Sequence, residues 1–251
     1  MTQTRQSAPR ARRGFTFIEI LFIVAVIATL AAIAVPNFLE AQVRSKVVAQ
    51  GQIAANLAMA LEAYRVDHRD YPPNVVFDRL VAEGSLQQAA ALNVGQLTAA
   101  MPWLADLPPH QQQIIRDWET SNTKQPMPER DAGAYALARL NSALSLSVLM
   151  NAEPDAGGLT YLPPDVFNRS WGATLDPMGY LRLDATLADA APNAWHRPVN
   201  ARWLAWSAGP AHAALPVAMA ADAPAVYDPT NGTVSFGTLI YDRHGAWSPA
   251  R

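Results

Sequence analysis

The longest apolar stretch of the chain runs from Phe15 to Val35, and Glu19 is its only strongly polar residue. A helix needs about 20 predominantly apolar residues to cross a hydrocarbon core about 30 Å thick. The 21 residues of this stretch meet that requirement, so the pattern predicts a transmembrane helix over residues 15–36. A carboxylate inside such a span costs free energy, so Glu19 calls for a functional reason.

A helical period continues beyond the apolar span, from Phe38 to Tyr64. Apolar residues recur there in alternating steps of four and three, which is the spacing of one helix face. We therefore expect one long helix from Phe15 to Tyr64, with residues 37–71 as the spine of a globular head. The stripe consists of Val43, Val47, Gln50, Ala54, Leu57, Leu61 and Tyr64, and Gln50 alone interrupts its apolar character.

Two prolines bear on the course of this helix. Pro36 has no N–H and clashes with the preceding turn, which predicts a kink or a local loosening between Ala32 and Asn37. Pro72 cannot continue a helix and pushes the residue before it out of helical geometry, so the helix should end before it.

Residues 72–160 have a mainly helical pattern, interrupted at Gly84, at Pro102, at Pro108 and by a polar stretch over 121–130. Pro109 suits a first helical turn, and Asp131 suits an N-cap. The expected helices are Phe77–Glu83, Leu86–Trp103, Pro109–Thr120 and Ala132–Met150.

The pattern changes again in residues 161–251, where short strand-like runs alternate with turn sequences such as Asn231-Gly232. We expect an antiparallel sheet that packs one face on the helix Val43–Tyr64. The chain is thus predicted to be an α+β protein: a long N-terminal helix, a helical region and a small C-terminal sheet. The expected strands are Tyr180–Asp184, Arg202–Ser207, Ala225–Tyr227 and Thr233–Tyr241.

Charge is distributed unevenly along the chain. Residues 1–14 hold four arginines and no acid, so the remainder holds 15 basic and 21 acidic residues. A basic leader before an apolar span predicts a cytoplasmic N-terminus with the rest of the chain on the other side of the membrane. The acidic exported part argues against nucleic acid as a partner. The chain has no cysteine, which excludes disulfides and thiolate metal sites.

The segment Arg13-Gly14-Phe15-Thr16-Phe17-Ile18-Glu19 resembles the class III signal of type IV pilins and type II secretion pseudopilins. The resemblance implies a leader over residues 1–14, cleavage between Gly14 and Phe15 by a prepilin peptidase, and N-methylation of Phe15. Glu19 then becomes the fifth residue of the mature chain, and Pro36 matches a proline of many family members. Two plainer interpretations stay open: an uncleaved anchor, and a secretory signal with Ala32-Ile33-Ala34 as its cleavage site.

A second resemblance lies at the predicted end of the long helix. The sequence from Ala63 to Pro72, with its Tyr71-Pro72 pair, is similar to the helix exit of the major pseudopilin. In that family a short connection follows, so about 80 residues of the 72–160 region look like an insertion. This insertion is expected to cover one side of the head or to offer a surface to a partner.

Electrostatics supplies a reason for Glu19. Cleavage before Phe15 would create a cationic amine at the membrane, and a lone buried charge is far more costly than a paired one. If subunits assemble by stacking these helices, Glu19 of one copy can neutralise the Phe15 amine of the next. We therefore expect Phe15, Glu19 and Pro36 to be the residues that matter for assembly.

No catalytic constellation is apparent in the sequence, and we expect no enzyme. The five histidines lack a metal-ligand spacing, and Ala205-Trp206-Ser207-Ala208-Gly209 only approaches a nucleophile elbow. No cofactor is required. Because the major pseudopilin binds calcium near its C-terminus, Asp222, Asp228 and Asp242 are candidate calcium ligands, with solvated turn aspartates as the alternative.

The sequence thus predicts a subunit of a type IV pilus-like fibre or of a type II secretion pseudopilus. Its expected partners are the prepilin peptidase, further pilin or pseudopilin subunits, an inner-membrane assembly platform and membrane lipid. It should cross the bacterial inner membrane once, with an extracytoplasmic head. The alternative is a membrane-anchored extracytoplasmic binding module that does not polymerise.

Overall fold

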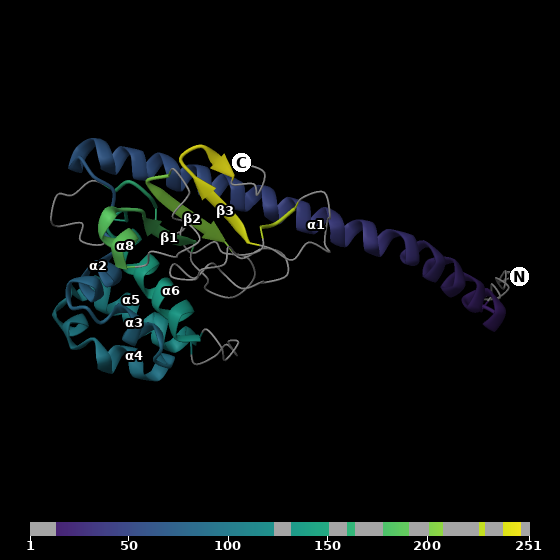
Figure 1. The fold of residues 1–251 in the computed structure, drawn as a ribbon. Helices are drawn as coiled ribbons and strands as arrows, with labels where there is room; N and C mark the ends of the chain where they lie inside the picture. The colour runs from purple at the N-terminus through teal and green to yellow at the C-terminus, as the bar shows by residue number, and fades with distance from the viewer. Residues whose placement is uncertain are drawn as a thin grey trace, which may run out of the picture. The chain divides into compact units, whose positions relative to one another are not determined.

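The computed structural model of the protein describes residues 14–122, 132–150, 160–163, 178–190, 201–207, 226–228 and 238–246. The chain divides into two compact units, residues 1–42 and residues 43–251. A single helix, α1 (Phe17–His68), belongs to both of them (Figure 1). The predicted long helix is therefore confirmed, although it begins two residues later and ends four residues later than expected.

Pro36 lies inside α1, and residues on both sides of it are helical. The helix is therefore not unwound between Ala32 and Asn37 in the single chain, and the alternative, a kink at Pro36, stays a prediction. A proline removes one backbone hydrogen bond and crowds one turn, and a helix that is well formed on both sides can absorb that cost. The prediction that the helix ends before Pro72 is confirmed. Helix α1 stops at His68, and Arg69 adopts a left-handed conformation with a φ of 65°.

The second unit contains a four-stranded antiparallel sheet with the order β1-β2-β3-β4. Tyr180 lies opposite Ala205, and Ala205 lies opposite Tyr241, so neighbouring strands along the chain are neighbours in the sheet. The predicted α+β class is confirmed. The strands are β1 (Gly179–Arg182), β2 (Trp203–Ser207), β3 (Leu239–Asp242) and β4 (Gly245–Ala246).

Some predicted strands differ from those observed. Val226 forms only an isolated parallel bridge with Thr238, so the strand expected over Ala225–Tyr227 is wrong. The two-residue strand β4 and the helix α8 (Ala185–Ala190) were not predicted, because both are too short to show a period. The turn Asn231-Gly232, residues 233–237 and the proposed N-cap Asp131 lie outside the described residues.

The insertion is helical, as predicted, but one long element is divided. The expected helix Leu86–Trp103 is three elements, because Asn93 and Gln96 form a capping box that starts a new helix and Pro102 starts a turn of 3-10 helix. The elements are α2 (Val75–Ala82), α3 (Leu86–Ala90), α4 (Val94–Ala100), η1 (Pro102–Asp106), α5 (Pro109–Asn122) and α6 (Ala132–Ser147).

The sheet is buried on both faces, and the alternation along each strand divides its side chains between two cores. One face packs on the second half of α1, where Ala54, Leu57 and Leu61 meet Tyr180, Ala205 and Tyr241. The other face packs on the insertion, as Figure 1 shows for α2 and α6. The strand side chains on the insertion side are Leu181, Leu204, Trp206 and Ile240. The insertion therefore covers the sheet face that α1 leaves open.

Tyrosines in this core make the head sensitive to alkali. Burial raises the pKa of Tyr241 to about 12 and raises that of Tyr180 further, whereas a tyrosine in an unfolded chain titrates at about 10. Above pH 10 the unfolded state therefore binds fewer protons than the folded state, so stability falls as the pH rises. We expect a loss of about 1.4 kcal/mol per pH unit for each tyrosine. Denaturant titrations at pH 9 to 11.5 give the free energy of unfolding at each pH. Its slope against pH should be smaller in Tyr241→Phe, because one fewer proton is then released on unfolding.

Candidate functional site

The first candidate site is the start of α1, where Thr16 and Glu19 form a reciprocal pair of hydrogen bonds. The backbone N–H of Thr16 donates to Glu19 Oε2 at 3.4 Å, and the backbone N–H of Glu19 donates to Thr16 Oγ1 at 3.3 Å. With Thr16 as N-cap and Glu19 as the third helical residue, this is a capping box, although both bonds are long. Glu19 thus has a local role at the helix start besides the assembly role that we expected.

The sequence contained this signal, because Thr16-Phe17-Ile18-Glu19 has the T-x-x-E spacing of a capping box. From the sequence we expected only a partner in another copy for Glu19. A negatively charged side chain in the first turn is also favoured by the positive end of the helix dipole. Loss of the Glu19 carboxylate would therefore change both the helix start and any contact between copies.

The residues that follow form an apolar surface with no cover inside the chain. Every residue from Gly14 to Leu39 is exposed, and Phe15 and Phe17 are exposed to 73% and 84%. Among the described residues, α1 is the one helix long and apolar enough to cross a membrane, and its most apolar window has a mean hydropathy of 2.8. Exposed apolar surface of this extent is the mark of a membrane or protein interaction site.

In the second unit, the outer face of α1 also exposes apolar side chains. Val48, Met59 and Val66 are each more than 60% exposed, and they are the large exposed hydrophobic residues of the described head. Their spacing of 11 and 7 residues places them on one helix face. The opposite face of α1 carries the stripe that packs on the sheet.

Gln50, the polar interruption of that stripe, has a partner in the sheet. It is only 6% exposed, and Ser207 Oγ at the end of β2 donates to its Oε1 at 3.0 Å. This bond ties α1 to the sheet at one axial position. It also occupies Ser207 in a structural role, and Ser207 is buried, so it does not have the exposure of a catalytic nucleophile.

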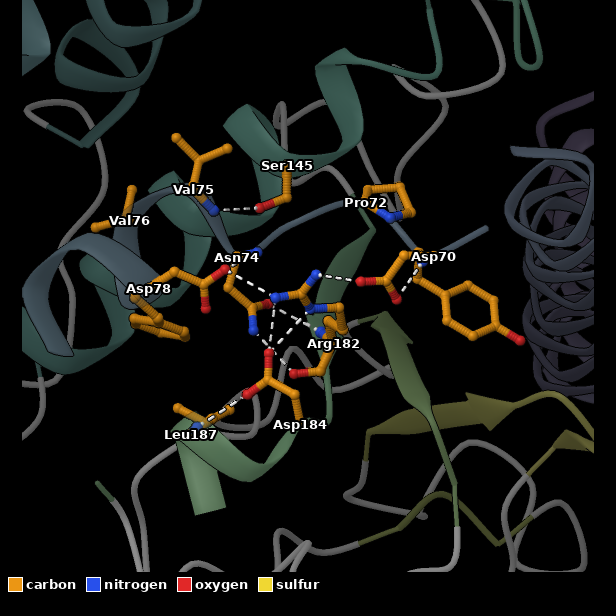
Figure 2. A network of polar contacts seen from close by, with 12 residues as sticks. Asp70, Pro72, Asn74, Val75, Val76, Asp78, Ser145, Arg182, Asp184 and Leu187 are labelled. Carbon is orange, nitrogen blue, oxygen red and sulfur yellow. Dashed lines mark hydrogen bonds and ion pairs between the residues drawn. The ribbon is translucent and has the colours of Figure 1, made fainter. Parts of the chain in front are cut away.

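A cluster of charged side chains centred on Arg182 joins the end of α1 to the insertion and the sheet (Figure 2). Arg182 lies at the end of β1, with its side chain 18% exposed. Its guanidinium contacts three carboxylates: Asp70 just after α1 at 3.1 Å, Asp78 in α2 at 3.1 Å and Asp184 just before α8 at 2.8 Å. Two parts of the chain that lie about 100 residues apart, residues 70–78 and residues 182–184, therefore meet at one side chain.

The electrostatics of this cluster follow from its burial. Burial raises the pKa of Asp78, and the Arg182 guanidinium opposes that rise. Burial opposes the charge of Arg182, but the carboxylates of Asp78 and Asp184 outweigh it, so the pKa of Arg182 is raised. The arginine therefore stays charged and offsets part of the repulsion among the three acids.

Two side chains of the insertion seal the outer edge of β1. Asn74 exchanges two hydrogen bonds with the backbone of Arg182, both at 2.9 Å. Ser142 Oγ accepts from the N–H of Tyr180 at 2.9 Å and contacts its carbonyl oxygen at 3.2 Å. These side chains take the place of a neighbouring strand, so the edge cannot pair with another chain. No sequence period marks either residue, because both act through tertiary contacts.

Removal of the arginine from this cluster should destabilise the head. A fully buried ion pair that loses one partner costs about 3–5 kcal/mol, and this cluster is partly exposed, so we expect Arg182→Met to cost about 2 kcal/mol. Urea unfolding of the full chain in detergent, monitored by tryptophan fluorescence, measures this change in the free energy of unfolding. Arg116→Met, at an exposed arginine of α5, is the control and should change stability by less than about 0.5 kcal/mol. Equal effects of the two variants would contradict the role given to Arg182.

Of the three candidate calcium ligands, the structure describes Asp228 and Asp242. Asp228 is exposed, and Asp242 Oδ1 accepts from the backbone N–H of His244 in the turn between β3 and β4. Asp222 lies outside the described residues, as do His196 and His212. Within the described part of the chain, no set of three His, Cys, Asp or Glu side chains is arranged to hold a metal ion.

Comparison with known proteins places the first site in a family context. Residues 9–35 match the prokaryotic N-terminal methylation motif, which contains Gly14, Phe15 and Glu19. The motif and the apolar helix together fit a membrane-anchored pilin. No solved structure matches the chain significantly.

Three curated proteins are similar to part of the chain. It is 53% identical to the type IV major pilin of Myxococcus xanthus over 45 residues, which are 18% of this chain and 19% of that protein. It is 42% identical to the type II secretion system core protein G of Pseudomonas aeruginosa over 25% of this chain and 44% of that protein. It is 35% identical to the type IV wide pilus major component of Thermus thermophilus over 26% of this chain and 50% of that protein. The matches thus span about a fifth to a half of these relatives, and they relate part of this chain to pilus and type II secretion proteins.

Proposed function

We propose that this chain, whose N-terminal segment is that of a type IV pilin or pseudopilin, is a structural subunit of a pilus-like fibre or of a type II secretion pseudopilus. The observation that carries the proposal is the exposed apolar half of α1, most of which lies within the methylation motif over residues 9–35. A membrane can cover this surface before assembly, and the same helices of other copies can cover it afterwards. The matched relatives are named as pilus and secretion components, which supports a structural and non-enzymatic role.

Processing is the first step of the proposed function. A prepilin peptidase would cleave between Gly14 and Phe15, and Phe15 would be N-methylated. Gly14 is exposed, and a side chain built there would meet no atom of the chain within 4 Å. Thr16 then becomes the second residue of the mature chain, so the capping box with Glu19 survives cleavage.

The orientation and partners follow from the same segment. The four leader arginines favour a cytoplasmic N-terminus, and the head would then lie outside the inner membrane of a bacterium. An inner-membrane assembly platform would receive the processed chain, and further subunits would join through α1. The exposed face with Val48, Met59 and Val66 extends the apolar surface of α1 into the head and would be covered in the same assembly.

The intact mass of the protein purified from its host tests this proposal. A chain that begins at N-methylated Phe15 and forms sheared fibres or cross-linked ladders supports it. A chain that begins at Met1 and stays monomeric after detergent extraction supports the anchored binding module instead. A start at Val35 indicates a secreted protein and overturns both.

Calcium remains part of the proposal as a ligand of the C-terminal turns around Asp222, Asp228 and Asp242. Carboxylates and backbone carbonyls are the oxygen ligands that calcium prefers. If calcium binds there, millimolar calcium should raise the melting temperature of the wild-type chain, and Asp228→Ala should abolish the increase. An unchanged melting temperature on addition of a chelator would remove the ion from the proposal.

A further inference from the structure

The apolar half of α1 carries very few charged side chains. Between Phe15 and Ser45 the sequence contains three of them, Glu19, Glu40 and Arg44. Cleavage before Phe15 would add a cationic amine, which gives the segment two positive and two negative charges. They form two pairs of opposite sign, at positions 15 and 19 and at positions 40 and 44. The two members of each pair are four residues apart.

These charges lie along one face of the helix. Glu19, Glu40 and Arg44 are all part of α1, and each of them is at least partly exposed. At 3.6 residues per turn, Glu40 and Arg44 lie within about 60° of Glu19 around the helix axis. Lys46, the next charged residue, is exposed about half a turn away from them, on the opposite face. A neighbouring helix that contacts Glu19 can therefore also contact Glu40 and Arg44.

The expected pairing of Glu19 with the Phe15 amine fixes a shift between two neighbouring copies. Position 15 of one copy is then level with position 19 of the other, a shift of four residues or about 6 Å along the helix. Because the copies are identical, the same shift applies at every level, so position 40 of the first copy is level with position 44 of the second. Glu40 of the first copy would thus lie beside Arg44 of the second. Without a shift, each charge would lie beside its equal and repel it.

We propose that Glu40 and Arg44 form a second ion pair between neighbouring copies of this chain, an inference that rests on the proposed fibre function. One copy supplies Glu19 and Arg44, and its neighbour supplies the Phe15 amine and Glu40. The two ion pairs are 25 residues or about 38 Å apart along α1, so together they specify the shift between copies at two points. Complementary charges of this kind fix the register of a contact more than they add to its affinity.

The same two residues can also pair within one helix. Both Glu40 and Arg44 already interact with other groups of the single chain. An exposed pair four residues apart stabilises a helix only slightly, so an exchange of partners between copies costs little free energy. A test must therefore separate a pair within one copy from a pair between two copies.

Two variants of opposite charge make this separation. Arg44→Glu leaves carboxylates at positions 40 and 44, and Glu40→Arg leaves cations at both, so neither variant can form the pair within its own helix. A mixed fibre in which the two variants alternate can form the pair between copies. The control, Lys46→Glu, makes the same change of charge as Arg44→Glu on the opposite face of α1. All are expressed as full chains, singly or together, and sheared fibre is quantified together with the melting temperature and the mature N-terminal mass.

We expect Arg44→Glu and Glu40→Arg each to lose fibre yield about tenfold or more when expressed alone, because like charges then meet at every such contact. Higher salt should restore part of that yield by screening. Co-expression of the two should restore about half of the wild-type yield or more, and Lys46→Glu should keep the wild-type yield. Wild-type yield from either variant alone, an equal loss from the control, or no recovery on co-expression would overturn the inference and leave the fibre function intact. Wild-type chain that forms no fibres would overturn the fibre function and the inference with it.

Discussion

Replacement of Gly179 by alanine should lower the free energy of unfolding of the head by about 3 kcal/mol, at the upper end of the usual cost of an overpacked core. Gly179 begins β1 and lies directly opposite Trp206 of β2. A Cβ atom added at Gly179 would overlap the indole ring of Trp206, which is 3% exposed and packed in the core on the insertion side. The ring can make room only if it displaces other side chains of that buried core.

Gly51→Ala is the matched control for this experiment. Gly51 lies within α1, and a Cβ atom there would meet no other atom within 4 Å. Because alanine is the better helix former by about 1 kcal/mol, Gly51→Ala should stabilise the chain slightly. Urea unfolding of the full chain in detergent measures both variants. The double variant Gly179→Ala/Trp206→Leu should recover part of the loss, and an unchanged midpoint for Gly179→Ala would contradict the predicted overlap.

The hydrophobic pattern predicted the elements that are long enough to show a period. The stripe from Val43 to Tyr64 identified the face of α1 that packs on the sheet, and the short apolar run Trp203–Trp206 identified β2 as a strand. Gly179 lies just before the expected strand Tyr180–Asp184, and a sequence cannot show that a glycine lies against a tryptophan 27 residues later. Close approach of that kind depends on strand register, which the pattern alone did not fix.

The candidate sites show the same difference. Some consist of residues that are contiguous in the sequence, and others form only when distant residues meet in the folded chain. The methylation segment and the Thr16–Glu19 capping box are contiguous, so the sequence contains both of them. The Arg182 cluster joins residues 70–78 to residues 182–184, and no sequence pattern connects two parts of the chain that far apart. The predicted insertion was correct in place and class, but its two alternative roles could not be separated until the structure placed it against the sheet.

Removal of the negative charge of Glu19 should abolish fibre assembly while cleavage and membrane insertion continue. If Glu19 pairs with the Phe15 amine of a neighbouring copy, its loss leaves an unpaired buried charge, which costs about 3–5 kcal/mol per contact. Association should then weaken by about 100-fold or more, since 1.4 kcal/mol corresponds to a factor of ten. Insertion should not suffer, because a carboxylate within the span opposes transfer into the membrane.

The capping box supplies the variants that separate the two roles of Glu19. Glu19→Gln removes the charge and keeps an acceptor for the N–H of Thr16, whereas Thr16→Val keeps the charge and removes the hydroxyl that accepts from the N–H of Glu19. If the charge pairs between copies, Glu19→Gln should eliminate sheared fibres and Thr16→Val should retain them, with mature N-terminal mass and membrane fraction unchanged in both. The opposite result would mean that Glu19 acts by starting its own helix, since assembly would then tolerate the loss of charge and fail on the loss of the cap.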